Sequence, residues 1–521
     1  GRELYIVAGS DVILNASAYR QEGPGTAATY NHILFTRVDT AHVDDPRRAE
    51  DILKGTIVSL SLPAYYESAS STQIRDYIDK DLDIGMLVDP VVQDFIYARG
   101  LYLRMPQYKR EITALASGGC EVRESGTFYE AVYRDGAGTA RARIRAKSVG
   151  VTDLYDALDG MRAAAEIVRK LASGRILLVE QTEGGGEELR QLLCDLLARS
   201  LEREHTYALY LGAGEAEADI AAQAGFLPIP GQGDLLYADM RSPLVLIEDA
   251  LQRIKEPFAS DEAVVAAVLS TRPSLRRAIA NLFPGKLLLC FDMEAINAGL
   301  IEKVRARNGV ADVPPAEKRY GKFMCVPYGK ILADTIVPNT VTKALHADKV
   351  FHADESGFDI TESPGYSLLV NQVKTLKSFR RPVLLIDDLL HNGYRLEKLD
   401  PLFRQEGVEI ERIIVGVLSG RGLDLMREQN REVDCEYFIP NMLYWFTESL
   451  LFPFIGGDSV SGEIGDRDYP PSINLILPYQ YPKYLHGASA PSVRQFSRVA
   501  LKNALTILGV LEDRYLKLQG T

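Results

Sequence analysis

Short apolar runs, each followed by a polar turn and a helical pattern, recur along this chain. One such run occupies residues 56–63, and another occupies residues 383–386. Alternation of short buried strands with helices is typical of parallel sheets that are covered by helices. The pattern therefore predicts an α/β fold.

The chain is long enough for about three or four domains, since it has 521 residues. The sequence pattern changes near residue 112. Beyond it, glycines separate polar strands at 128–133 and 140–145, and this pattern predicts an antiparallel meander. We expect four segments: a parallel α/β domain over 1–111, a mixed sheet over 112–245, a helical connector over 246–285 and a second parallel α/β domain over 286–521.

Composition excludes several classes of protein. Lys and Arg number 59 against 71 Asp and Glu, so the net charge of −12 argues against sequence-independent binding of nucleic acid. The five cysteines show no paired spacing, which argues against a zinc site or a disulfide framework and fits a reducing cytoplasm. No apolar run reaches transmembrane length, so we expect no membrane contact. The sequence predicts a cytoplasmic protein of undetermined oligomeric state that binds small nucleotides.

Residues 69–75 (ASSTQIR) follow the apolar run at 56–63 and predict a helix start. The hydroxyls of Ser71 and Thr72 would lie beside the free N–H groups of the first turn, with Arg75 one turn further on. Such a helix start attracts polyanions, and a guanidinium matches phosphate oxygens. The alternative is an ordinary N-cap next to a solvent-exposed arginine.

This heptapeptide resembles the ISSTxIR motif of the nucleotidyltransferase superfamily that includes nicotinate-nucleotide adenylyltransferases. Residues 5–11, which contain G-x-D, and residues 32–37, 87–92 and 100–102 are similar to further motifs of that family. The resemblance covers roughly residues 1–105 and implies a Rossmann-like domain that binds ATP or CTP with Mg²⁺. The implied nucleotide contacts are Gly9, Asp11, Ser71, Thr72 and Arg75.

Two departures from that family limit the prediction. Its HxGH motif, which stabilises the reacting phosphorus centre, would precede residue 1, and neither His32 nor His42 has the required spacing. Tyr19 replaces a tryptophan that stacks on the acceptor, which weakens nicotinate mononucleotide as the acceptor. We therefore expect a partial domain with little turnover by itself, and its catalytic residues stay unassigned.

A glycine-rich turn, residues 181–189, follows the apolar strand 175–180 and opens a helix. Glycines let backbone amides approach a pyrophosphate at such a helix start. The turn resembles the acetyl-CoA loop of GNAT acyltransferases, and the resemblance covers roughly residues 112–245. It implies that Gln181, Gly184 and Gly186 contact acetyl-CoA.

This second resemblance is also incomplete. Ala221 stands where that family has a tyrosine that protonates the departing thiolate, and Glu187 and Glu188 add negative charge after the turn. A degenerate fold that turns over no acyl-CoA is therefore the alternative.

The apolar run at 383–386 ends in Asp387 and Asp388, and a short loop then opens a helix. Ligands bind at the carboxyl ends of parallel strands, where carboxylates accept hydrogen bonds from sugar hydroxyls or hold Mg²⁺. The amides of the loop and of the helix start can hold a terminal phosphate.

This run resembles the PRPP-binding motif of type I phosphoribosyltransferases, over roughly residues 315–420. It implies that Asp387 and Asp388 contact the ribose and that Lys330 lies in the pyrophosphate loop. The implied phosphate contacts are His391, Asn392, Gly393 and Arg395. The family favours Thr or Ser around its glycine, so a protein of this fold without transferase activity is the alternative.

All three resemblances involve phosphorylated nucleotide-type ligands. They predict a nucleotidyltransferase of the adenylyltransferase or cytidylyltransferase type within a multifunctional enzyme of nucleotide-cofactor metabolism, such as NAD biosynthesis. The first alternative is an acetyl-CoA-dependent acyltransferase or a PRPP-dependent phosphoribosyltransferase with a vestigial first domain. The second is a non-catalytic sensor of nucleotides.

Overall fold

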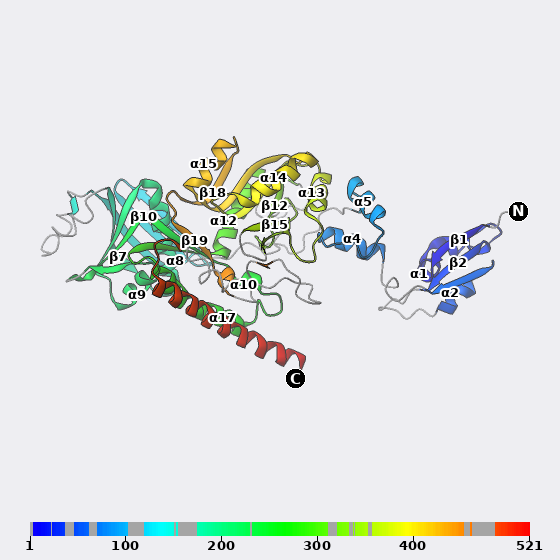
Figure 1. The fold of residues 1–521 in the computed structure, drawn as a ribbon, viewed down its shortest axis with the longest axis horizontal. Coiled ribbons are helices and arrows are strands. Elements are labelled where there is room, and N and C mark those ends of the chain that lie inside the picture. Colours follow the sequence, from blue (N-terminus) through cyan, green and yellow to red (C-terminus); the bar gives the residue numbers. More distant parts are fainter. Residues whose placement is uncertain are drawn as a thin grey trace. The chain divides into compact units, whose positions relative to one another are not determined.

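The computed structural model describes most of the chain and shows an α/β fold, as predicted (Figure 1). It describes residues 4–21, 23–36, 46–61, 70–102, 119–150, 153–154, 174–229, 232–310, 320–332, 337, 339–352, 357–452, 459–460 and 485–520. The chain forms two compact units, of which the first comprises residues 1–104 and 365–367 and the second comprises the remainder. No helix within the described ranges is both long and apolar enough to cross a membrane.

A three-stranded parallel sheet opens the first unit. Its strands lie in the order β1 (Tyr5–Gly9), β2 (Asn31–Thr36), β3 (Ile57–Ser61). Helices α1 (Ser10–Asn15) and α2 (Pro46–Ile52) bury Ile13 and Ala49 with Leu34 of the sheet, and two short 3-10 helices, η1 (Ser17–Tyr19) and η2 (Ala27–Thr29), connect α1 to β2. Val7, Val58 and Leu60 stay exposed, so the sheet presents apolar side chains to solvent.

Two further helices complete the first unit. Helix α4 (Ser71–Asp79) begins at the cap residue Ser70, whose hydroxyl accepts a hydrogen bond from the Gln73 amide. Helix α5 (Pro90–Arg99) begins after Asp89, which caps the Val91 amide. Ile78, Ile84, Ile96 and Tyr97 form their shared core.

The second unit contains a nine-stranded mixed sheet. Its main path is β11-β10-β8-β7-β6-β5-β4, and β9 and β19 also pair with β10. The bounds are β4 (Gly119–Ser125), β5 (Phe128–Arg134), β6 (Ala140–Val149), β7 (Arg175–Glu183), β8 (His205–Leu211), β9 (Leu227–Ile229), β10 (Gln232–Glu248), β11 (Lys286–Asp292) and β19 (Tyr444–Thr447). Strands β4, β5 and β6 form the predicted antiparallel meander, whereas β7 and β8 are parallel.

Several helices accompany this sheet, and two of its strands, β11 and β19, lie beyond residue 245 in the sequence. The glycine turn opens α8 (Gly186–Ser200), η3 (Leu201–Arg203) follows it, and α9 (Glu215–Gln223) precedes β9. The segment expected to be a helical connector contains α10 (Ala250–Arg253) and α11 (Glu262–Ala280). Strand β11, which we expected to open the last domain, pairs in parallel with β10 and so belongs to the mixed sheet.

A five-stranded parallel sheet forms the other half of the second unit, in the order β13-β12-β16-β17-β18. Its strands are β12 (Met324–Pro327), β13 (Val341–Thr342), β16 (Val383–Leu390), β17 (Ile410–Ser419) and β18 (Val433–Ile439). Its helices are α12 (Met293–Asn308), α13 (Leu369–Ser378), α14 (Tyr394–Glu406) and α15 (Gly420–Glu428). The 3-10 helix η4 (Glu448–Leu451) contacts β10 and β19, and α17 (Ala490–Gln519) packs on α11, so both belong to the half with the mixed sheet. A small sheet contains β14 (Ala347–Phe351), β15 (Phe358–Glu362) and β20 (Ser459–Val460).

One hydrophobic core joins the two large sheets of this unit. Helix α12 contacts β11 of the mixed sheet and also β16, β17 and β18 of the parallel sheet. Its buried residues Ile296, Leu300 and Val304 belong to the same cluster as Leu289 of β11 and Val417 of β17. The parallel sheet and the mixed sheet therefore share one hydrophobic core.

Candidate functional site

The strands β12, β16, β17 and β18 are parallel, so their carboxyl ends meet at one edge. Strand β16 runs to Leu390, because its pairing with β17 continues as far as Leu418. The strand therefore continues for two residues beyond Asp387 and Asp388, which were expected to end it. The loop after β16 consists of His391, Asn392 and Gly393.

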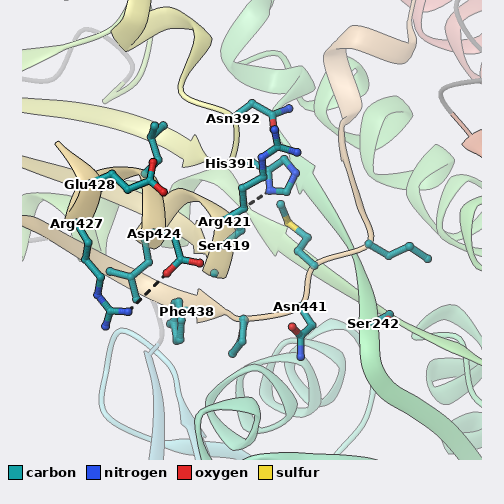
Figure 2. Close-up of a pocket in the computed structure, with 16 residues that line it drawn as sticks. Ser242, His391, Asn392, Ser419, Arg421, Asp424, Arg427, Glu428, Phe438 and Asn441 are labelled. Carbon is teal, nitrogen blue, oxygen red and sulfur yellow. Dashed lines mark hydrogen bonds and ion pairs between the residues drawn. The ribbon is translucent and has the colours of Figure 1, made fainter.

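A cavity of about 830 Å³ lies at this edge, between the ends of β16, β17 and β18 and helix α15 (Figure 2). Of the predicted contacts, His391 and Asn392 line it. The remaining lining residues are Ser242, Ser419, Gly420, Arg421, Leu423, Asp424, Leu425, Arg427, Glu428, Phe438, Pro440, Asn441, Met442 and Leu443. Asp387, Asp388, Gly393, Arg395 and Lys330 are not among these lining residues.

His391 is held in place by Ser419. Its Nδ1 lies 2.8 Å from the Ser419 hydroxyl, which also accepts a hydrogen bond from the Gly422 amide (Figure 2). Burial and the charge of Arg421 lower the pKa of His391, so the imidazole is neutral at physiological pH. A neutral imidazole fixed in this way can donate or accept one hydrogen bond at its other nitrogen.

Asn392 brings an unused hydrogen-bonding atom to the same cavity. Its Oδ1 is buried and has no hydrogen-bond partner among the residues that the structure describes. A buried amide oxygen without a donor costs free energy. Because the oxygen and nitrogen of an asparagine exchange by a flip, this position can meet either a donor or an acceptor of a ligand.

Helices α14 and α15 both begin at this edge. Helix α14 starts after Gly393, which has φ of +69° and offers no side-chain cap, so the first amides of the helix lack a side-chain acceptor. A Cβ at Gly393 would lie 2.4 Å from Leu425 Cδ2, which explains the glycine by close packing. Arg421, in the first turn of α15, is exposed and lines the cavity. Uncapped amides and a guanidinium together favour an anion.

Sequence reasoning did not identify Arg421. The available signal was the run Ser419-Gly420-Arg421-Gly422, in which glycines surround a cation directly after a buried strand. The acidic pair in the preceding strand drew the prediction to Arg395 instead.

Arg395 is engaged elsewhere. Its Nη1 donates a hydrogen bond to Asp387 Oδ1 at 2.5 Å, and its guanidinium lies 4.9 Å from the ring centre of Tyr328. Asp387 is buried, and this burial raises its pKa well above the ordinary value despite the charge of Arg395. The pair therefore consists of a buried carboxylate and a half-buried guanidinium, and neither residue lines the cavity.

Asp388 is more accessible than Asp387. It is half-buried, and one of its carboxylate oxygens accepts a hydrogen bond from the Leu389 amide. Its charge contributes to raising the pKa of Arg253, a residue of α10 whose main partner is Asp249 at 3.1 Å. Lys330 lies half-buried in the turn after β12. The described residues contain no cluster of three or more side chains that could hold a metal.

The predicted acetyl-CoA loop has a structural reason for its glycines. Gly184 has φ of +93°, and a Cβ there would lie 2.4 Å from the Arg141 carbonyl oxygen of β6. Gly186 has φ of +62° at the start of α8. Gln181, on β7, lines a cavity of about 80 Å³ with residues of β5 and β6. These positions would keep glycines without any ligand.

Glu187 binds two arginines instead of facing an open loop. Its carboxylate accepts hydrogen bonds from Arg190 at 2.7 Å and from Arg276 at 3.2 Å. Arg276 in turn forms a two-pronged ion pair with the fully buried Glu248, at 2.6 and 2.7 Å. The acidic first turn of α8 reduces the attraction of its amino end for a pyrophosphate.

The predicted nucleotide site of the first unit is accessible. Ser71, Thr72 and Arg75 are exposed, and the Arg75 guanidinium lies 5.2 Å from the ring centre of Tyr102. Gly9 ends β1 and Asp11 follows it in α1, although the Asp11 side chain lies outside the described part of the chain.

Of the two histidines compared with the HxGH motif, His32 lies among the described residues. His32 is fully buried between Tyr19 Oη at 3.1 Å and the Tyr30 carbonyl oxygen at 2.8 Å, which assigns it a structural role. His42 lies outside the described residues.

Comparison with known proteins leaves the family open. No protein-family model and no curated protein matches the chain. One solved structure with a match is an adenine phosphoribosyltransferase from Thermoanaerobacter pseudethanolicus, at 13% identity and a TM-score of 0.17. The match covers 33% of this chain and 85% of that one, and so low a score carries no argument about function.

Proposed function

We propose that the carboxyl edge of the five-stranded sheet binds a phosphorylated ribose of the PRPP type. One observation carries this proposal: His391, Asn392 and Arg421 line the same cavity of about 830 Å³, and Asn392 brings an unpartnered buried atom to it. The uncapped start of α14 lies directly after this loop. Together these groups supply the amides, the neutral donor and the cation that a phosphate monoester requires.

The rest of the ligand would extend toward the accessible carboxylate. Asp388 is the half-buried acid of the pair and would accept a hydrogen bond from a ribose hydroxyl, whereas Asp387 is engaged by Arg395. Mg²⁺ prefers oxygen ligands and usually arrives bound to substrate phosphates, with one or two protein carboxylates. Asp388 fits that limited role, and Lys330 would balance charge on a pyrophosphate.

The reaction we propose is phosphoribosyl transfer, in which a nucleophile displaces pyrophosphate at C1 of the ribose. Positioning and charge neutralisation supply most of the rate in such a displacement. Arg421, the amides that begin α14 and the accessible carboxylate of Asp388 fit that task. Asp424 and Glu428 also line the cavity and add negative charge, which Mg²⁺ bound to the substrate would offset. Binding without turnover would instead support a sensor.

Calorimetric titration with PRPP and Mg²⁺ tests the binding step. We expect Asp388→Asn to weaken binding by roughly tenfold, the effect of one hydrogen bond to a charged group. Glu397→Gln is the matched control, because Glu397 is an exposed acid of α14 that does not line the cavity. Absence of any heat or spectroscopic change with PRPP at millimolar concentration would refute the proposal.

Nucleotidyl transfer in the first unit is the second candidate. The exposed hydroxyls of Ser71 and Thr72 and the exposed Arg75 favour it, because the start of α4 can receive a triphosphate without rearrangement. Labelled ATP and CTP test this candidate. Binding that is lost in Arg75→Ala supports it, and binding that persists there contradicts the assigned role of Arg75.

A further inference from the structure

The carboxyl-terminal helix α17 has two apolar faces. One face packs on α11 and buries Phe496, Ala500 and Ile507. A neighbouring stripe is open to solvent, where Leu501, Leu505 and Leu516 are 42%, 62% and 43% exposed. Three leucines at helical spacing on an open face mark an interaction surface.

Two charged residues lie at equal distances before and after Leu505, the most exposed of these three leucines. Arg498 lies seven residues before Leu505, and Glu512 lies seven residues after it. Seven residues are about two helical turns, so all three side chains lie along one stripe. Both charged residues are exposed, and neither has an ion-pair partner in the part of the chain that the structure describes.

Gly509 lies on the same side of the helix, one turn after Leu505. Glycine weakens a helix interior relative to alanine. Its backbone is not in the left-handed region, and a Cβ there would meet nothing within 4 Å. The fold of the single chain therefore gives no reason for a glycine, whereas close approach of another helix does.

We propose that two copies of this chain pair through α17 in antiparallel orientation, with Leu505 of each copy at the two-fold axis. Reversal about Leu505 places Arg498 of one copy level with Glu512 of the other, about 10.5 Å from the axis on each side. The same operation places Leu501 level with Gly509 of the second copy. This inference does not depend on the proposed ligand.

The charge pattern favours a second copy over other occupants. Asp513 is paired with Lys517 at 3.0 Å, and Arg514 is paired with Asp261 at 2.5 Å. Arg498 and Glu512 have no such partner among the described residues, so each can pair with its opposite in a reversed copy of the helix. A helix that lies on an anionic membrane would carry basic residues along the whole polar boundary. Glu512 within the stripe opposes that arrangement.

The oligomeric state of the full chain tests the proposal. Sedimentation equilibrium or light scattering should show a dimer of the wild type at micromolar concentrations. Leu505→Arg places two charges at the axis and should raise the dimer Kd by about 100-fold or more. Thr506→Arg is the matched control, since Thr506 is exposed on the adjacent side of the helix, and it should leave the dimer intact.

A charge swap tests the orientation. Arg498→Glu should weaken the dimer by roughly tenfold, because it creates a like-charge pair on both sides of the axis. The double variant Arg498→Glu/Glu512→Arg should restore it. Gly509→Leu should also weaken the dimer. The thermal midpoint of this variant, measured at protein concentrations below the dimer Kd, should not fall, because the monomer gives no reason for a glycine.

Three outcomes would overturn the proposal. They are a wild type that stays monomeric at high micromolar concentration, a dimer that Leu505→Arg leaves unchanged, and a charge swap that fails to restore pairing. Unchanged circular dichroism of each variant separates loss of pairing from loss of fold.

Discussion

Arg395 and Asp387 form an ion pair of 2.5 Å beneath the ring of Tyr328, between helix α14 and strand β16. Arg395 was expected to contact the phosphate of a ligand, and Asp387 was expected to contact its ribose. In the proposed function, the phosphate would therefore contact Arg421 and the ribose would contact Asp388. This relationship separates the residues that stabilise the candidate site from those that are free to bind.

Arg395→Leu should therefore destabilise the protein. The substitution leaves a buried carboxylate without its partner, which typically costs about 3–5 kcal/mol. Arg404→Leu, on the same helix and 74% exposed, should cost less than about 0.5 kcal/mol. Denaturant unfolding followed by circular dichroism compares the two variants, and equal midpoints would contradict a structural role for the pair.

Asp239 should contribute stability that depends on pH. Burial raises its pKa, but hydrogen bonds from Arg241 and Lys286 outweigh burial and hold the value at about 2. Because the folded pKa is below the unfolded one, the contribution is complete above about pH 4 and is lost as pH falls toward 2. Asp239→Asn should thus lower the thermal midpoint at pH 6 and have a smaller effect at pH 2. An equal difference at both pH values would show that the carboxylate is not the cause.

The glycine turn before α8 offers a pair of matched substitutions. Gly184→Ala should cost about 2 kcal/mol or more, because φ is +93° and the new Cβ would meet the Arg141 carbonyl oxygen. Gly185→Ala should be tolerated, since its φ is −167° and its Cβ would meet nothing within 4 Å. Thermal midpoints compare them, and similar losses at both positions would contradict the described turn.

Substitutions at the start of α4 can distinguish residues that stabilise the fold from residues that would bind a triphosphate. Ser70→Ala removes the cap on the Gln73 amide and should cost about 1 kcal/mol. Ser71→Ala and Thr72→Ala change exposed hydroxyls and should cost less than about 0.5 kcal/mol. If the first unit binds a triphosphate, the latter two variants weaken binding although their unfolding midpoints are unchanged. A loss of stability in them equal to that of Ser70→Ala would assign all three hydroxyls to the fold.

The sequence predicted the strand and helix classes well because apolar periodicity is a local property. The meander β4–β6 and the strand before Asp387 follow directly from it. Partner choice was not local: β11 joins the mixed sheet through contacts with β10, and β16 extends to Leu390 because β17 continues beside it. Neither neighbour is encoded within the strand itself.

Side-chain roles were harder still to predict. Motif spacing marked Arg395 and Glu187 near phosphates, yet each finds an oppositely charged partner, Asp387 and Arg276, respectively. Arg421 lies on a separate strand-to-helix turn that no motif singled out. Whether a cation faces a cavity depends on which opposite charges lie near it in the fold. Local motif spacing in a single sequence does not reveal those partners.

The central claim is that a phosphate binds beside Arg421, and titration with ribose 5-phosphate tests this claim most directly. Arg421→Glu should weaken binding by at least about 30-fold, since it replaces a cation by an anion. Arg404→Ala, which changes an arginine of α14 that is 74% exposed, paired with Asp400 and outside the cavity lining, should change binding by less than about threefold. Equal affinity of wild type and Arg421→Glu for ribose 5-phosphate would contradict the account.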